Sequence, residues 1–314
     1  MGYSVAPAGD INKDGFDDII IGAPYANSNR GEAYVIYGKQ TGARISLATT
    51  LNQVTTGIMI KGNANNDFLG GSVSTAGDIN NDGFDDIIIG APYKSSKKGA
   101  AYVIYGRANP VHLDLQTALA PATTGFMVSG KSAGEMFGIS VGLAGDINKD
   151  GFDDIVIGAE ARNSDQGAVQ VIYGGPNSGF SNFDLSTPLD PTTKGFIVAG
   201  EASDDSLGFS IASAGDVNKD GYDDILIGAP KKNSKRGAIY VVYGGATSSR
   251  ANIDLSTKEL NPLIDGFTIL GTLSSSQFTF SVVAIDLNKD GNVELLVGAP
   301  YVNYAYVIFP ASRS

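Results

Sequence analysis

The chain has 314 residues and carries a formal net charge of −11, with a pI near 4.5. This acidity argues against a nucleic-acid-binding protein, which needs a basic face to neutralise phosphates. Cysteine is absent, which excludes disulfides and thiolate chemistry, and no run approaches the roughly 20 apolar residues of a membrane-spanning helix. Hydrophobic residues (42%) and 41 glycines fit a globular fold of short strands and tight turns.

A sequence repeat organises the chain. The segment GDINKDGFDDIIIGAP begins at Gly9 and returns four times, the last time in the altered form IDLNKDGNVELLVGAP. The first aspartates of the loops lie 68 or 70 residues apart, and the repeat cores start near residues 1, 69, 137, 207 and 278. We therefore predict a single repeat-built domain over residues 1–314.

Each repeat predicts the same series of strands. A strand of small residues such as GYSVAPAG comes first, an apolar strand such as DDIIIGAP second and an aromatic strand such as EAYVIYG third. A fourth strand (GIMIKG, GFMVSG, GFIVAG, GFTILG) ends four repeats, whereas the fifth repeat ends after its third strand. This pattern predicts an all-β fold, a β-propeller with five visible blades and a three-stranded last blade.

Other arrangements of the repeats fit the same pattern. An open β-solenoid is one, although units of about 69 residues are long for one rung. The five repeats could close as a ring or form part of a larger propeller, whose missing portion we would expect on the N-terminal side because the altered fifth copy resembles a capping end. Met1 falls where other copies have Leu69, Phe137, Leu207 and Phe278, which indicates a chain that starts inside a repeat.

The acidic segment between the first two strands has the spacing of a cation-binding loop. Acidic or amide side chains occupy positions one, three, five and nine, and Gly15 at position six permits a sharp turn. All donors are oxygens, including the carbonyl of position seven, so calcium fits better than zinc, and a flexible loop admits it more readily than magnesium. The predicted ligands are Asp10, Asn12, Asp14, Phe16 and Asp18; Asp78, Asn80, Asp82, Phe84 and Asp86; Asp146, Asn148, Asp150, Phe152 and Asp154; Asp216, Asn218, Asp220, Tyr222 and Asp224; and Asp286, Asn288, Asp290, Asn292 and Glu294.

These loops differ from an EF-hand, which needs a bidentate Glu at position twelve. We therefore predict sites closed at position nine, with up to five calcium ions, one per repeat. The fifth loop departs most, because Glu294 is longer than Asp and Val293 replaces a neighbouring Asp. The alternative is that the Asp-Gly and Asn residues simply make turns. In place of the position-twelve Glu of an EF-hand, the five loops have apolar residues: Ile21, Ile89, Ile157, Ile227 and Val297.

Together these motifs resemble a known family. The pair Phe137 and Gly138, the DxNxDGxxD loop and the Gly-Ala-Pro of residues 22–24 are similar to the FG-GAP repeats of the integrin alpha-subunit β-propeller, over essentially the whole chain. The resemblance implies blades whose calcium loops join the first and second strands on one face, in rings that usually have seven blades. The departures are Leu69 and Leu207 in place of Phe, Glu160 in place of Pro, and Thr279 in place of Gly.

The loops between the second and third strands should emerge at the opposite end of each blade. They carry nine of the chain's 22 basic residues. One interpretation is a basic rim that attracts an acidic protein or a glycan; the other is solubility and protection of strand edges. The candidate ligand-binding residues are Arg30, Lys97, Lys98, Lys235 and Arg236.

Little in the sequence indicates catalysis. The only histidine, His112, lies in the variable segment VHLDL, and the abundant carboxylates are already assigned as calcium ligands. We expect a non-enzymatic, calcium-binding adhesion or binding module, extracellular or on the cell surface, whose signal peptide has been removed. The alternatives are an accessory propeller domain of a secreted hydrolase or phospholipase, and a structural or engineered repeat scaffold.

Overall fold

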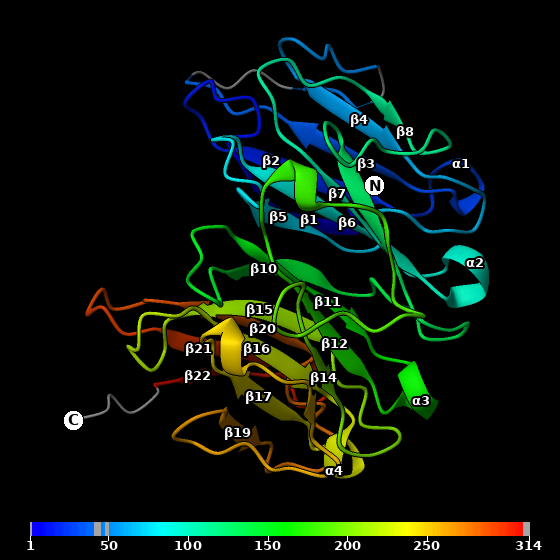
Figure 1. Cartoon of the computed structure of the whole chain (residues 1–314). Coiled ribbons are helices and arrows are strands. Elements are labelled where there is room, and N and C mark those ends of the chain that lie inside the picture. Colours follow the sequence, from blue (N-terminus) through cyan, green and yellow to red (C-terminus); the bar gives the residue numbers. More distant parts are fainter. Residues whose placement is uncertain (1, 41–44, 48–49, 310–314) are drawn as a thin grey trace. The chain divides into compact units, whose positions relative to one another are not determined.

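The computed structural model describes residues 2–40, 45–47 and 50–309, which form five β-sheets and only very short helices (Figure 1). The all-β prediction is therefore confirmed, while Met1, where the first repeat was placed to begin, lies outside the described residues. Two compact units divide the chain: Met1–Val141 with Gly175–Thr187, and Gly142–Gly174 with Pro188–Ser314. Each unit is described by itself.

The first unit contains two five-stranded sheets, each a propeller blade. Neighbouring strands run antiparallel except for the last, two-residue strand, which is parallel to its partner. The first sheet has the order β1 (Ser4–Gly9), β2 (Asp18–Ala23), β3 (Glu32–Ile36), β4 (Gly57–Lys61) and β8 (Leu113–Asp114). The second has the order β5 (Val73–Gly77), β6 (Asp86–Ala91), β7 (Ala100–Ile104), β9 (Gly125–Ser129) and β13 (Phe183–Asp184).

The second unit contains the other three sheets, of five, four and three strands. The three-stranded last blade is as predicted. The sheets are β10 (Val141–Gly145), β11 (Asp154–Ala159), β12 (Ala168–Ile172), β14 (Ile197–Ala199) and β18 (Ile253–Asp254); β15 (Ser210–Gly215), β16 (Asp224–Ala229), β17 (Ala238–Val242) and β19 (Gly266–Leu270); and β20 (Ser281–Ile285), β21 (Glu294–Ala299) and β22 (Tyr304–Ile308).

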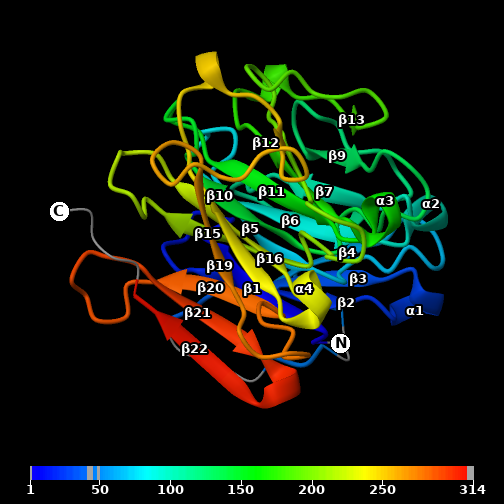
Figure 2. The ribbon, with the colours of Figure 1, turned by 90° about the horizontal axis from the view of Figure 1, so that it is seen from below.

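Three sheets thus have one strand more than the four predicted. The added strands β8, β13 and β18 come from the long loop of the following repeat, which reaches back to the fourth strand of the preceding blade; Figure 2 shows β13 beside β9. The prediction missed them because two-residue strands leave no periodic pattern. The signal was the recurring apolar-Asp-Leu tripeptide at residues 113–115, 183–185 and 253–255.

The connections between second and third strands are tight helical turns: α1 (Ala26–Asn29), α2 (Lys94–Lys97), α3 (Arg162–Asp165) and α4 (Lys232–Lys235). Their central residues are left-handed, with φ of 48° at Asn27 and 58° at Ser28, which suits Asn. In the first unit, α1 and α2 lie at the end of the sheets away from the loops that precede β2 and β6 (Figure 1). Three 3-10 turns cover Asn177–Gly179, Thr247–Ser249 and Pro300–Val302.

The core lies around the second and third strands. Every residue of β6, β11 and β16 is buried, which explains why these strands are continuously apolar: they are covered on both faces. The small-residue strand β1 lies against β5, and β15 lies against β20. Ser, Ala and Gly are used there because neighbouring blades approach closely.

The Gly-Ala-Pro motif has a steric cause. A Cβ placed on Gly22 would lie 2.1 Å from the carbonyl oxygen of Gly70 in the next blade, and one on Gly90 would lie 2.0 Å from that of Gly138. The partners Gly70 and Gly138 follow the Phe or Leu of the next repeat. The two halves of the repeat signature therefore meet at the contact between blades, where only a hydrogen fits.

Candidate metal-binding loops

The predicted ligand loops join the first strand of each sheet to the second. In the first loop, the two carboxylate oxygens of Asp10 accept hydrogen bonds from the Asp14 and Gly15 amides, at 3.0 and 2.8 Å. Asn12 Oδ1 accepts from the Asp14 amide at 2.9 Å, and Asp14 Oδ1 accepts from the Phe16 amide at 3.1 Å. The side chains at positions one, three and five therefore all turn toward the inside of the loop.

All five loops share this arrangement. The same four hydrogen bonds occur in each, with lengths between 2.7 and 3.1 Å. The fifth loop keeps them despite its altered sequence, because the residues at positions one, three, five and six are unchanged. Its differences lie at the other positions, such as Ile285 in place of Gly and Leu287 at position two, and at positions seven to nine.

The carboxylate at position nine anchors the loop to the sheet. Asp18 is 1% exposed, and its oxygens accept hydrogen bonds from the Ile11 amide at 3.2 Å and the Gly38 amide at 2.8 Å. Equivalent pairs of bonds reach Asp86, Asp154 and Asp224. Position nine thus ties the start of its loop to the end of the third strand.

Burial makes these position-nine carboxylates costly to ionise. Desolvation raises the pKa of Asp18 to about 7; the Gly38 and Ile11 amides oppose the shift, and nearby aspartate charges add to it. Burial also raises the pKa of Asp86 to about 9 and that of Asp224 to about 7, and holds that of Asp154 well above its ordinary value. A cation beside these groups would favour their charged form.

The oxygen donors of each loop are of the kind that a hard cation binds, but in this structure they accept hydrogen bonds from the loop itself. Each loop offers carboxylate, amide and carbonyl oxygens, the ligands that calcium takes. In the described part of the chain, however, no three His, Cys, Asp or Glu side chains are grouped so as to hold a metal. The carboxylates instead accept hydrogen bonds from their own loop, as in Asp10 and Asp14.

Position eight has a role that sequence reasoning missed. The Asp85 carboxylate accepts a hydrogen bond from the Asp10 amide of the preceding blade at 2.7 Å, and Asp223 does the same for Asp146 at 2.9 Å. A Cβ on Gly9 would lie 2.3 Å from Asp85 Oδ2, so this close approach requires glycine. The signal was the doubled Asp-Asp of the first four loops.

The candidate ligand-binding residues divide into two groups. Arg30 forms an ion pair with Asp114, and Lys98 Nζ lies 3.1 Å from Asp184. Both acidic partners belong to the added strands β8 and β13, so these two basic residues connect successive repeats. The ammonium of Lys97 lies 5.3 Å from the Tyr93 ring centroid. The side chains of Lys97, Lys235 and Arg236 are exposed.

His112 is hydrogen-bonded to strand β4. Its Nδ1 accepts a hydrogen bond from the Met59 amide at 3.0 Å, and its Nε2 lies 3.1 Å from the Leu51 carbonyl oxygen. The first bond places the acceptor on Nδ1, so Nε2 carries the hydrogen that the Leu51 carbonyl accepts. The ring is therefore held as a neutral tautomer beside the edge of β4.

Sheets of three to five short strands, built on one repeat with an acidic loop between its first two strands, define a protein of the β-propeller class. The FG-GAP repeat signature matches residues 1–36, 69–104, 137–172, 207–242 and 278–308. These segments make up more than half of the sequence, and the chain belongs to the FG-GAP repeat family. The predicted resemblance to integrin alpha repeats is confirmed.

Several relatives align with most of the chain. Integrin alpha pat-2 of Caenorhabditis elegans is 32% identical over 280 residues, 85% of this chain, and integrin alpha-V of Gallus gallus is 29% identical over 267 residues, 84% of this chain. Phosphatidylinositol-glycan-specific phospholipase D of Homo sapiens is 31% identical over 245 residues, 73% of this chain. The chain spans 21%, 22% and 26% of these relatives' own lengths. No helix among the described residues is long and apolar enough to cross a membrane.

Proposed function

We propose that the chain is a calcium-stabilised, non-enzymatic binding module, with one calcium ion in each acidic loop. The observation that carries the proposal is the position-nine carboxylate, a buried acid placed beside two further acidic side chains in a loop whose donors are all oxygens. Side chains at positions one, three, five and nine and the carbonyl of position seven would hold the ion. Binding would require some carboxylates to exchange amide contacts for the metal.

Charge and energy support the same proposal. Five divalent ions would offset most of the net charge of −11 and relieve repulsion within the loops. With dissociation constants near 10⁻⁴ M, about 1 mM calcium would stabilise the fold by roughly 1.4 kcal/mol per site, or about 7 kcal/mol for five independent sites. Such weak sites would be filled outside the cell, where we place the protein.

Thermal unfolding in about 1 mM calcium, in excess chelator and in magnesium tests this proposal. We expect calcium, but not magnesium, to raise the melting temperature, and calorimetric titration to count four or five sites. The variant Asp82→Ala should remove one site. The variant Asp17→Ala changes a position-eight carboxylate that hydrogen-bonds to no described residue, and it should leave the count unchanged. An identical melting curve with calcium and with chelator would mean that the loops are turns that do not bind calcium.

We further propose that the end of the blades opposite the loops binds an acidic protein or glycan. The exposed lysines Lys97 and Lys235 at the tips of α2 and α4 support this, because neither is committed to an ion pair in the described structure. The double variant Lys97→Glu/Lys235→Glu should abolish binding to acidic glycan arrays or cell surfaces. Lys39→Glu, outside these turns, is the control; equal binding by both variants would refute the basic rim.

A second candidate function is an accessory domain of a larger hydrolase, which the similarity to a phospholipase D favours. The sequence of the full-length gene would distinguish the binding module from the accessory domain. A catalytic domain next to this segment would support the accessory role, and enzyme assays with and without the propeller would then measure its contribution to substrate capture.

A further inference from the structure

An ionic cluster lies beside α4 in the fourth blade, the sheet of β15, β16, β17 and β19. The Lys232 ammonium lies 2.5 Å from the Glu201 carboxylate and 3.5 Å from that of Asp205. The Tyr240 hydroxyl donates a hydrogen bond to the same Glu201 carboxylate at 3.1 Å. Lys232 is 5% exposed and Tyr240 is 3% exposed. The single carboxylate of Glu201 therefore serves a buried lysine and a buried tyrosine at once.

The second blade repeats this cluster with one change. The corresponding residues of the two blades are Lys94 and Lys232, Tyr102 and Tyr240, Asp67 and Asp205, and Asn63 and Glu201. The change is Asn63, an amide where the fourth blade has a carboxylate. Its Oδ1 accepts a hydrogen bond from Lys94 Nζ at 3.0 Å, and its Nδ2 donates to the Leu115 carbonyl at 2.7 Å. Asn63 is thus held against the loop after β8 and makes no hydrogen bond to the Tyr102 hydroxyl.

The change leaves the second blade with an unpartnered donor. The Tyr102 hydroxyl is buried and has no hydrogen-bond partner among the described residues, and Tyr102 as a whole is 4% exposed. Burial, and then the charge of Asp67, raises the pKa of Tyr102, so the hydroxyl keeps its hydrogen. The Lys94 ammonium has one described acidic partner, Asp67 at 3.4 Å, where Lys232 has two. Because a buried donor without an acceptor is unfavourable, this blade has a place for one more acceptor, and the fourth blade shows that a carboxylate fits that place.

A cavity of about 160 Å³ lies at this place, within the first unit. Lys94 and Tyr102 line it together with the apolar side chains of Leu115, Leu119 and Met127. These three apolar residues pack in the same hydrophobic cluster as Tyr102. A cavity of about 150 Å³ is enough for a molecule the size of benzene. The space can therefore hold a small organic molecule with one polar end and one apolar end.

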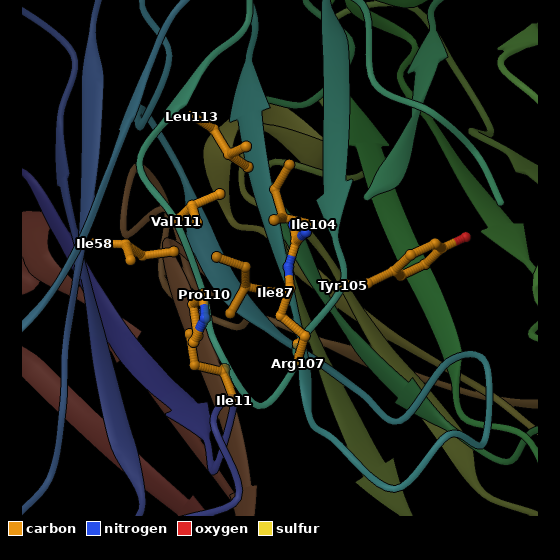
Figure 3. A pocket seen from close by; sticks show the side chains of 10 residues that line it. Ile11, Ile58, Ile87, Ile104, Tyr105, Arg107, Pro110, Val111 and Leu113 are labelled. Carbon is orange, nitrogen blue, oxygen red and sulfur yellow. The ribbon is translucent and has the colours of Figure 1, made fainter. Parts of the chain in front are cut away.

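Another cavity of the same unit lacks these features. Figure 3 shows it between Ile58 of β4, Ile87 of β6 and Val111. It has about 10 Å³, which is room for no more than one water molecule. The Tyr105 hydroxyl, which also has no described partner, points away from it (Figure 3). At Tyr102, by contrast, the unpartnered hydroxyl belongs to a residue that lines a cavity of useful size.

We propose that the cavity lined by Lys94, Tyr102 and Asn63 binds a small aliphatic monocarboxylic acid, whose carboxylate takes the place that the Glu201 side chain has in the fourth blade. The carboxylate accepts hydrogen bonds from the Tyr102 hydroxyl and the Lys94 ammonium, and the short hydrocarbon chain lies against the apolar wall. The charged groups then match those of the fourth blade, one lysine with two carboxylates. Lys94 belongs to α2, at the end of the blade away from the acidic loops, so binding does not require calcium in those loops (Figure 1).

The test is nuclear magnetic resonance of the whole chain with isotope-labelled methionine methyl groups, titrated with sodium butyrate at constant ionic strength. Of the three methionines in the described structure, Met59, Met127 and Met136, Met127 lines the cavity. We expect the Met127 signal to shift and saturate while the signals of Met59 and Met136 stay in place. Butyramide has the same chain without the charge. It should bind at least about tenfold more weakly, because the donors Lys94 and Tyr102 lose their charged acceptor.

Variants locate the carboxylate within the cluster. Asn63→Glu supplies the carboxylate that the fourth blade has, so it should abolish butyrate binding while the protein stays folded. Tyr102→Phe removes only the unpartnered hydroxyl, and it should weaken binding about tenfold without lowering the melting temperature. Tyr105→Phe is the matched control, because its hydroxyl is also buried and unpartnered but does not belong to this cavity. It should leave the affinity for butyrate unchanged.

The outcomes decide the proposal in either direction. A saturable Met127 shift that is lost in Asn63→Glu and kept in Tyr105→Phe would support the site. Absence of a saturable shift, or equal binding by Asn63→Glu and the parent chain, would overturn it. Equal affinity for butyramide and butyrate would also overturn it, because the cavity would then recognise the hydrocarbon chain and not the carboxylate.

Discussion

The Asp85 carboxylate accepts a hydrogen bond from the backbone amide of Asp10 at 2.7 Å, across the contact between the first and second blades. Asp10 opens the acidic loop of its own blade, so one contact links blade packing to loop geometry. Asp223 and Asp146 repeat this relationship within the second unit. In the second and fourth repeats the doubled aspartate thus has two tasks: position eight contacts the preceding blade, and position nine holds its own loop.

Replacement of Asp85 by Ala should destabilise the protein by about 1–3 kcal/mol, because the amide of Asp10 loses its acceptor in a partly buried contact. Chemical denaturation in chelator measures this loss apart from any metal effect. Asp17→Ala is the matched control, since Asp17 holds the same repeat position but is exposed and contacts no described acceptor or donor. Equal stability of the two variants would show that the hydrogen bond between the Asp10 amide and the Asp85 carboxylate does not stabilise the protein.

Replacement of Gly90 by Ala should destabilise by about 1–3 kcal/mol or prevent folding, because a Cβ there lies 2.0 Å from the Gly138 carbonyl oxygen and the backbone must shift. The measurement is the midpoint of urea unfolding. Gly179→Ala, where a Cβ meets nothing within 4 Å, should leave the midpoint nearly unchanged. A stable Gly90→Ala protein would show that the Gly90 and Gly138 backbones lie farther apart than in this structure.

Truncation of Leu255 to Ala should cost about 2–5 kcal/mol, because its side chain is 5% exposed and its removal leaves a cavity beneath β18. Leu263→Ala, in the same loop but at a side chain that is 76% exposed, should change the free energy of unfolding by less than about 0.5 kcal/mol. The difference between these variants measures how firmly the added strand is anchored. Similar values would contradict the anchoring role of the apolar-Asp-Leu tripeptide.

Asp184 should contribute a pH-dependent stability. The Ser186 amide and then the Lys98 side chain lower the pKa of its carboxyl in the folded protein. The contribution is therefore fully present above the unfolded pKa, about 4, and is lost as the pH falls through the lowered folded value. We expect Asp184→Asn to melt about 1–3 °C below the parent at pH 7, and the difference to vanish near pH 2–3. A difference that persists in acid would indicate a cause other than charge.

Much of this protein is determined by sequence alone. The DxNxDGxxD loop depends on contacts among its own residues, so this segment has the same conformation in every copy. The loop bonds of Asp10 and Asn12 are of this kind, since all their partners lie within five residues. The fold class and the candidate ligand loops were predictable for that reason.

Only the tertiary structure decided which side chains serve neighbouring blades. Asp85 and Asp10 are 75 residues apart, and Arg30 and Asp114 are 84 apart, so neither contact leaves a local pattern. Arg30 and Arg236 follow the same helical turn in their blades, yet Arg30 pairs with Asp114 of the following repeat and Arg236 is exposed in the described structure. Such differences depend on what the next repeat supplies, which one repeat's residues cannot encode.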